Sequence, residues 1–203
     1  NVNVPFLPNT ITVHSNVLTD IAHKGIWMVN IGTSWFNPAS VYDNEITYTL
    51  SNPTSRIGIV IENSDFMSVY NNSVVRDAGS TYYPGELNNL VGIWIEESFG
   101  QRVKDNKLEY LGHGIHGIGL LNETQFSCNE LFYNYHGFHF DLVNQTVISH
   151  QGSETNPTDN VWLDGTMGDT WRIRGELEEI GTPTVAPNWY TRTSSTTDFM
   201  FLA

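Results

Sequence analysis

The sequence predicts an all-β fold in which short, equivalent strands stack on one another as a solenoid. Two alternating sequence elements support this prediction. The first reads apolar-x-x-Asn-x-apolar and occurs five times, with its asparagine at Asn16, Asn44, Asn72, Asn106 and Asn129. The second reads Gly-apolar-x-apolar and occurs at residues 25–28, 58–61, 92–95, 117–120 and 137–140. Apolar residues separated by two follow the period of a β-strand, and helical spacing is nearly absent.

Strands this short are stable only when neighbouring repeats satisfy their backbone groups and cover their apolar faces. The two apolar residues of each glycine element are expected to face the core: Ile26 and Met28, Ile59 and Ile61, Ile93 and Ile95, Ile118 and Leu120, and Phe138 and Phe140. Asparagine suits the turn between strands, because it tolerates the left-handed conformation and its amide can bond the asparagine of the next coil. We therefore expect the five repeated asparagines to form an internal structural ladder.

Over residues 9–150, the alternation of these two elements resembles the right-handed parallel β-helix repeat of the pectate-lyase-like superfamily, of the kind found in secreted bacterial surface proteins. The resemblance implies a single-stranded right-handed parallel β-helix. It implies no particular activity, because that superfamily includes lyases, hydrolases, epimerases, adhesins and tail spikes.

After residue 150 the repeat fades into a turn-rich stretch with several aromatic residues, among them Trp162, Trp171, Trp189 and Tyr190. The open end of a solenoid needs a cover, because exposed strand edges promote aggregation. We expect residues 1–150 to form β-helix coils with inserted loops, the longest at 77–86, and residues 151–203 to form an irregular, aromatic-rich C-terminal cap. Residues 156–162 also resemble the segment that closes β-helices in many secreted bacterial surface proteins.

The charge balance limits the partners of this protein. Nine Lys and Arg residues stand against 22 Asp and Glu residues, which gives a formal net charge of −13. Nucleic-acid binding is not expected, because each phosphate contact needs a cation. The sequence has no apolar run long enough to span a membrane. The composition suits an extracellular or cell-surface protein, either a mature product or part of a larger polypeptide or assembly.

The two-residue alternation also predicts which side chains face outward. One outward column is expected to contain Trp27, Trp94 and His139, and the next column Glu62, Glu96 and Asp141. Adjacent coils lie about 4.8 Å apart, so Glu62 and Glu96 are expected to be neighbours. Three interpretations of these ligand-binding candidates remain open: an ordinary hydrated face, a carbohydrate-binding face on which aromatic rings stack against sugars, or a catalytic carboxylate pair or calcium site.

Histidines form a second candidate site. His116 and His136 each precede the glycine of their element, so the alignment predicts that they stack on adjacent coils. Two such histidines could bind Zn²⁺ or Cu²⁺, with His139 and Asp141 completing the site. The alternative is that they lie in turns and bond backbone carbonyls. The single cysteine, Cys128, cannot form an internal disulfide, and its thiol is expected to be buried or half-buried.

The preferred interpretation of function is a non-enzymatic extracellular module whose acidic, aromatic face serves adhesion, glycan binding or assembly with other surface proteins. An alternative is a polysaccharide lyase or glycoside hydrolase that uses Glu62, Glu96 and Asp141. The lyases of the superfamily would be expected to have clustered Asp residues for calcium and an Arg or Lys base on a strand face. This sequence lacks that pattern, so no catalytic residue is transferred from the family. A structural spacer within a larger surface protein is the third interpretation.

Overall fold

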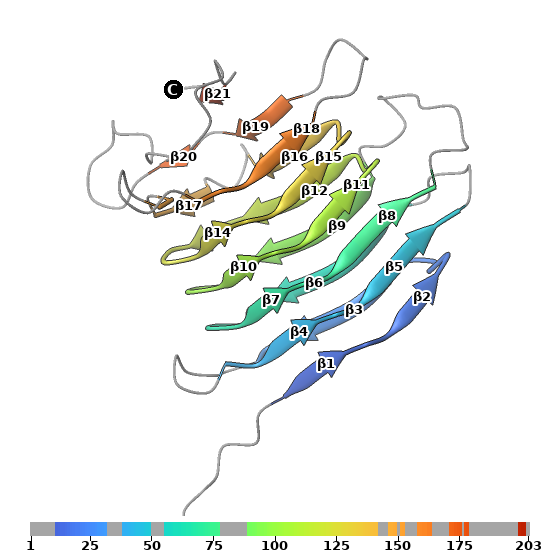
Figure 1. Ribbon diagram of the computed structural model, residues 1–203. Coiled ribbons are helices and arrows are strands. Elements are labelled where there is room, and N and C mark those ends of the chain that lie inside the picture. The colour runs from blue at the N-terminus through green and yellow to red at the C-terminus, as the bar shows by residue number, and fades with distance from the viewer. Residues whose placement is uncertain are drawn as a thin grey trace, which may run out of the picture.

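In a computed structural model, the protein is an all-β structure of parallel strands (Figure 1). The structure describes residues 11–31, 38–49, 55–77, 89–141, 146–149, 151–152, 158–163, 171–175, 177–178 and 199–201. Within these ranges, every strand pair is parallel and no helix occurs. The described part of the chain accordingly has no helix that could cross a membrane.

Three sheets each take one strand from successive repeats. Sheet A contains β1 (Thr12–His14), β4 (Ser40–Tyr42), β7 (Ser68–Tyr70), β10 (Arg102–Lys104) and β14 (Gln125–Ser127). Sheet B contains β2 (Val17–Thr19), β5 (Glu45–Tyr48), β8 (Ser73–Arg76), β11 (Lys107–Glu109), β15 (Glu130–Phe132) and β18 (Val161–Leu163). Sheet C contains β3 (Lys24–Val29), β6 (Arg56–Glu62), β9 (Leu90–Glu96), β12 (His113–Ile118), β16 (His136–Phe140), β19 (Trp171–Gly175) and β21 (Phe199–Phe201). A smaller sheet D contains β13 (Leu120–Leu121), β17 (Thr146–Ile148) and β20 (Leu177–Glu178).

The core lies between the sheets, and it is built from columns of apolar side chains in register. Sheets A and B lie side by side at the front of Figure 1, and sheet C lies behind them. In sheet A, Val41 pairs with Val69, and both side chains are fully buried. In sheet C, Ile59 pairs with Ile26 and with Ile93, as expected from the glycine elements. Each buried side chain of this size contributes roughly 1.5–3 kcal/mol to stability, and β-branched residues suit the pleated surface.

The fourth glycine element begins at Gly114, three residues before the expected Gly117. Ile115 follows Gly114 and pairs with Ile93 on one side and with Phe138 on the other. The expectation that Ile118 and Leu120 face the core is therefore wrong. Leu120 is 53% exposed. Ile118 is buried, but it does not belong to the cluster of packed apolar side chains that forms the core, which we call the core cluster.

The shift has a packing cause at Gly117. This residue pairs with Ile95 and Phe140, so it occupies a column that faces the core. A Cβ atom at Gly117 would lie 2.8 Å from Cδ1 of Phe140 and 2.6 Å from Cδ1 of Leu121. The larger neighbours therefore fill the space that a side chain at Gly117 would need.

A glycine near the start of each sheet C strand from β3 to β16 changes the outward spacing. A Cβ atom at Gly25 would lie 2.6 Å from the carbonyl oxygen of Gly58 and 3.3 Å from the core side chain of Ile46. Gly25 and the residue after it thus both face inward. The outward residues on either side, Lys24 and Trp27, are three positions apart, and the Lys24 ammonium lies 3.7 Å from the Trp27 ring centroid.

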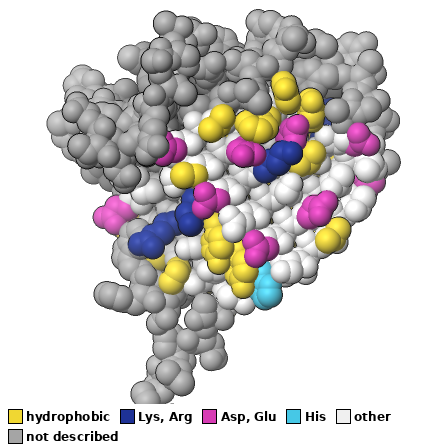
Figure 2. Space-filling model, viewed as in Figure 1, with side chains coloured by type: hydrophobic (Ala, Val, Ile, Leu, Met, Phe, Trp, Pro, Cys, Tyr) yellow, Lys and Arg dark blue, Asp and Glu magenta, His cyan; other side chains and the backbone are white. Residues whose placement is uncertain are grey.

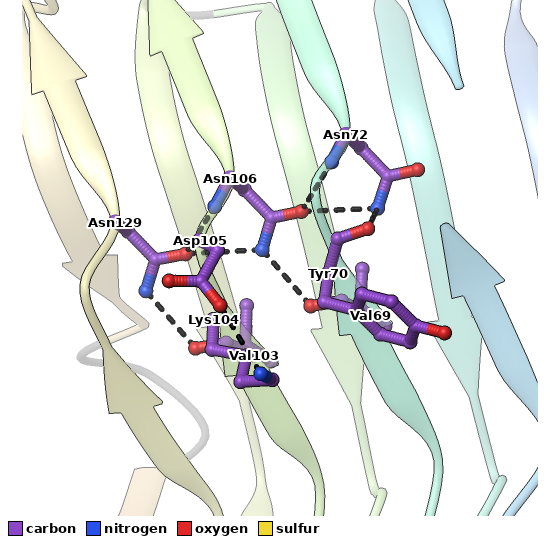
Figure 3. A network of polar contacts seen from close by, with 8 residues as sticks. All are labelled: Val69, Tyr70, Asn72, Val103, Lys104, Asp105, Asn106 and Asn129. Atoms are coloured by element: carbon purple, nitrogen blue, oxygen red, sulfur yellow. Dashed lines mark hydrogen bonds and ion pairs between the residues drawn. The ribbon is translucent and has the colours of Figure 1, made fainter. Parts of the chain in front are cut away.

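The repeated asparagines are hydrogen-bonded in series at the turn between sheets A and B, and Figure 3 shows the part from Asn72 to Asn129. The side-chain amides donate from Asn16 to Asn44 (2.8 Å), Asn44 to Asn72 (2.9 Å), Asn72 to Asn106 (3.0 Å), Asn106 to Asn129 (3.0 Å) and Asn129 to Asn160 (2.9 Å). The series thus extends beyond the fifth repeat to Asn160, which the repeat pattern did not identify.

The left-handed conformation of this turn falls on the residue before each ladder asparagine. The φ angle is 57° at Ser15, 53° at Asp43, 54° at Asn71, 54° at Asp105, 55° at Cys128 and 53° at Asp159. The expectation that the ladder asparagine itself takes this conformation is corrected accordingly. Asp and Asn tolerate positive φ well, whereas Cys128 does so without that preference. The Cys128 residue is exposed, so the prediction of a buried or half-buried thiol is wrong.

A second set of buried polar side chains satisfies the turn between sheets C and A. The Ser64 backbone N–H donates to Oγ of Ser98 at 3.1 Å. The Met67 N–H donates to Oε1 of Gln101 at 3.1 Å, and Nε2 of Gln101 donates to the Phe99 carbonyl at 2.8 Å. Buried backbone groups at this turn are thereby paired. The residue type at this turn differs from one repeat to the next, so the sequence pattern did not identify these contacts.

The sheets continue past residue 150, because β18 pairs with β15 and β19 pairs with β16. Much of the predicted cap, with Trp189 and Tyr190, lies outside the described residues, as does most of the predicted loop at 77–86.

Figure 2 shows the outer side of sheets A and B, where acidic and basic side chains are dispersed. One exposed pair there joins Nζ of Lys104 to Asp105 at 3.1 Å, a kind of contact worth about 1 kcal/mol or less.

Candidate functional site

The outward side of sheet C carries the predicted site residues, and we call it the sheet C face. Its five strands from β3 to β16 contribute residues to three outward columns, and the third column ends with Asp141, which directly follows β16. The first column contains Lys24, Ile57, Val91, His113 and His136. The second contains Trp27, Val60, Trp94, His116 and His139, and the third Val29, Glu62, Glu96, Ile118 and Asp141. Val60 and Val91 are buried but do not belong to the core cluster, which agrees with an outward direction.

Trp27 is held in place although 53% of it is exposed. Its indole N–H donates a 3.0 Å hydrogen bond to Oε2 of Glu62 on the next strand. Nζ of Lys24 lies 3.7 Å from the same carboxylate oxygen and 3.7 Å from the Trp27 ring centroid. The indole ring, the ammonium group and the carboxylate therefore orient one another at the surface.

Trp94 on β9 also bonds a glutamate, but this glutamate belongs to its own strand. Its indole N–H donates to Oε2 of Glu96 at 3.1 Å, and its ring centroid lies 4.4 Å from that of His116. Glu62 and Glu96 pair in register, as the alignment predicted. Each carboxylate accepts an indole N–H, and Lys24 lies beside Glu62, so the repulsion between the two like charges is partly offset.

Asp141 lies apart from these two glutamates. It follows β16, and β12 separates β16 from β9, so two strand spacings of roughly 5 Å each lie between Asp141 and Glu96. The sheet C face thus brings Glu62 and Glu96 together and places Asp141 near the histidines. Two carboxylates supply few of the six to eight oxygen ligands that calcium takes.

Four histidines gather beyond Trp94, and we call them the histidine cluster: His113, His116, His136 and His139. His113 pairs with His136, and His116 pairs with His139. The paired ring centroids lie 4.9 Å and 4.6 Å apart, and His113 and His139 lie 4.5 Å apart on the diagonal. The predicted pairing of His116 with His136 is therefore wrong, because the fourth glycine element begins three residues earlier than expected.

His116 is buried among these rings, and it is 8% exposed. Neither of its ring nitrogens has a hydrogen-bond partner among the described residues. Burial lowers the pKa of His116 from 6.5 to about 4; the nearby His139 also lowers it, and the Asp141 carboxylate raises it. The His116 imidazole is therefore neutral at neutral pH.

Three members of the cluster lie close enough together that they could hold a metal ion. One ring nitrogen from each of His113, His116 and His139 lies within 4.8 Å of the others. Among the described residues, this is the group of three or more histidine, cysteine and acidic side chains that comes close enough to hold a metal ion. The sequence prediction named His116 and His139 but left out His113.

One spacing in the sequence could have identified His113. Asn106 precedes Gly114 by eight residues, just as Asn129 precedes Gly137 by eight residues. Aligning these intervals sets His113-x-x-His116 against His136-x-x-His139, the spacing produced by the inward glycine. The sequence prediction also missed Lys24, because a strict two-residue alternation does not put it on the same side of the strand as Trp27.

Comparisons of this chain with protein-family models, with curated proteins and with solved structures found no match. The inferences about function below therefore rest on the contacts, burial and charge of the sheet C face.

Proposed function

We propose that this protein is a non-catalytic, extracellular module that binds carbohydrate through the exposed part of the sheet C face. The proposal depends on Trp27, which is 53% exposed although its indole N–H is hydrogen-bonded to Glu62. An exposed, immobilised aromatic ring offers a flat apolar surface and loses little conformational freedom when a ligand packs on it.

The polar groups around Trp27 suit a ligand rich in hydroxyl groups. Glu62 and Glu96 have acceptor capacity beyond the single indole hydrogen bond that each receives. Sugar hydroxyls can donate to these oxygens while an apolar sugar face packs against the indole. Lys24, which lies 3.7 Å from Glu62, offers donors to sugar oxygens. The two carboxylates stand on adjacent strands, so the polar groups form a row that an extended polysaccharide could follow.

We also propose the finer description of the fold, a right-handed parallel β-helix of the pectate-lyase-like kind. The strand order supports a helical winding, because the strands of sheet A are β1, β4, β7 and β10, and those of sheet B are β2, β5, β8 and β11. Crossover connections between parallel strands of one sheet are right-handed in about 98% of cases. The extracellular location is supported by the acidic composition, with a net charge of −13.

The carbohydrate proposal is tested with a panel of neutral, acidic and amino-sugar polysaccharides and the full chain, with and without calcium. We expect at least one polymer to bind in affinity electrophoresis and calorimetry. Trp27→Ala is expected to weaken binding by about 10-fold, which corresponds to about 1.4 kcal/mol. The matched control is Val17→Ala, because Val17 is a 72% exposed apolar residue on sheet B. Failure of the wild-type chain to bind any polymer, or equal binding by Trp27→Ala, would overturn the proposal.

The same panel separates the alternative functions. A lyase or glycoside hydrolase that uses Glu62 and Glu96 would release unsaturated products or reducing ends, and Glu96→Gln would abolish that release. A structural spacer would neither bind nor cleave any polymer. A module for assembly with other surface proteins would bind no carbohydrate but would retain protein partners.

A further inference from the structure

We propose that His113, His116 and His139 bind a divalent transition-metal ion, with Zn²⁺ as the expected metal. The three side chains come from the adjacent strands β12 and β16, and their ligand nitrogens lie within 4.8 Å of one another. Three imidazoles and a water molecule form a common tetrahedral zinc site. The site lies beyond Trp94 and is independent of the carbohydrate proposal.

The geometry depends on the inward glycine of each strand. Gly114 and Gly137 hold the equivalent position, and a Cβ atom at Gly114 would lie 2.7 Å from the Gly137 carbonyl oxygen. Because the glycine and its successor both face inward, each strand presents two histidines on the same side. Two strands in register therefore bring four imidazole rings together, with centroids 4.5–5.1 Å apart for His113 against His116 and His139.

His116 supplies an independent reason to infer a ligand. It is more than nine-tenths buried, and within the described part of the chain neither ring nitrogen has a hydrogen-bond partner. Leaving buried polar groups unpaired is destabilising, and a bound metal ion would offset that cost. A neutral imidazole nitrogen is also the form that coordinates a metal.

Packing alone does not require histidine at these positions. The equivalent outward residues are Ile57 and Val60 on β6, and Val60 is 1% exposed. Aliphatic side chains therefore fit these two outward columns on β6. The change from aliphatic residues to two His-x-x-His pairs replaces an inexpensive apolar surface with groups that are costly to bury.

The fourth histidine and Asp141 fit supporting roles. Nδ1 of His136 lies 2.9 Å from Nδ1 of His113, a contact that orients the His113 ring. The negative charge of Asp141 raises the pKa of His116, because it favours a positive charge at that position. The same carboxylate would favour a bound cation there. The donor set is imidazole nitrogen, which suits zinc, copper and nickel and does not suit calcium or magnesium.

The test begins with the full chain freed of metal by a chelator and then dialysed. Calorimetric titration with Zn²⁺ is expected to give one ion per chain, and excess Ca²⁺ and Mg²⁺ are expected not to compete. Co²⁺ is expected to give the visible absorption of a tetrahedral nitrogen site. Zn²⁺ is also expected to raise the melting temperature, because it binds the folded chain.

Variants identify the ligands. His116→Val is expected to abolish the stoichiometric site, and valine is chosen because Val60 occupies the equivalent position on β6. His139→Gln is the second ligand variant and decides the matter if His116→Val does not fold. His136→Gln is expected to weaken binding by about 10-fold to 100-fold, as for residues that orient a ligand. The matched control is His14→Gln, because His14 is exposed on β1 of sheet A.

Three results would overturn the metal proposal. The first is that the wild-type chain takes up no Zn²⁺ after chelation. The second is that folded His116→Val and His139→Gln variants bind Zn²⁺ with unchanged stoichiometry and affinity. The third is that His14→Gln weakens zinc binding as much as His116→Val does. Loss of zinc binding with unchanged carbohydrate binding would leave the proposed function intact, and the reverse result would leave the metal site intact.

Discussion

The side-chain amide of Asn72 donates a 3.0 Å hydrogen bond to Oδ1 of Asn106, which lies 34 residues further along the chain. Both side chains are buried, at 1% and 0% exposure. The same Oδ1 atom accepts the backbone N–H of Asn72 at 3.0 Å, and Nδ2 of Asn106 donates to the Val69 carbonyl at 2.9 Å. One asparagine thus satisfies groups of the preceding repeat at a turn that the strand ladders do not cover.

Replacement of Asn106 is expected to destabilise the protein strongly. Asn106→Leu leaves the Asn72 N–H and the Val69 carbonyl buried without their present partners, and each unpaired group costs roughly 1–3 kcal/mol. Urea unfolding is expected to give a loss of about 3 kcal/mol or more. The control is Asn16→Leu, because Asn16 lies at the exposed first position of the ladder and should lose less than about 1 kcal/mol. Equal losses at both positions would contradict the role of the ladder.

Gly114→Ala is expected to destabilise the protein through overpacking. The added Cβ atom would lie 2.7 Å from the Gly137 carbonyl oxygen and 2.8 Å from Cδ2 of Leu131. Such overpacking costs roughly 1–3 kcal/mol, measured as a lower urea midpoint. Thr12→Ala, at an exposed position on β1, is the control and should change stability by less than about 0.5 kcal/mol. A Gly114→Ala variant as stable as the wild type would refute the inward direction of the glycine.

Tyr48→Phe is expected to leave stability unchanged or to raise it by about 1 kcal/mol. Tyr48 is 1% exposed, its hydroxyl has no hydrogen-bond partner in the part of the chain that the structure describes, and burial raises its pKa. Phenylalanine keeps the ring and removes the unpaired hydroxyl. Thermal unfolding measures the change, with Tyr42→Phe on the outside of sheet A as the control. A clear loss of stability in Tyr48→Phe would mean that the hydroxyl is bonded in solution.

The metal-free protein is expected to lose stability as the pH falls from about 6.5 toward 4. The folded pKa of His116 is lowered to about 4 from an ordinary value of 6.5, so the unfolded chain binds more protons between these values. Acidification through this window therefore favours unfolding, by at most about 3 kcal/mol for a shift of this size. His113, His139, Asp141 and Trp94 surround the imidazole. His116→Val is expected to flatten the pH dependence of the urea midpoint, and an unchanged slope would contradict this origin.

The repeat pattern predicted the all-β class, the asparagine positions and the register of Glu62 with Glu96, because identical residues recurred at equivalent places. The pattern failed where several glycines lie close together in the sequence, and where different residue types take the same place in successive repeats. By sequence, Gly117 is the start that matches the Gly-apolar-x-apolar motif. In the structure, Gly117 instead fills the last apolar position of the element that begins at Gly114, and the Phe140 ring occupies the space beside it. The Ser98 and Gln101 turn contacts were not predictable, because different side chains satisfy the same backbone groups.

The central claim is that the Trp27 side of the sheet C face contacts carbohydrate. Nuclear magnetic resonance of the indole N–H groups measures this directly, with Trp27→Phe used to assign the Trp27 signal. Titration with a polysaccharide selected by the binding panel is expected to shift the Trp27 indole resonance in a saturable manner, because a sugar stacked on the ring changes its surroundings. Saturable binding that leaves the Trp27 resonance unchanged would contradict the account.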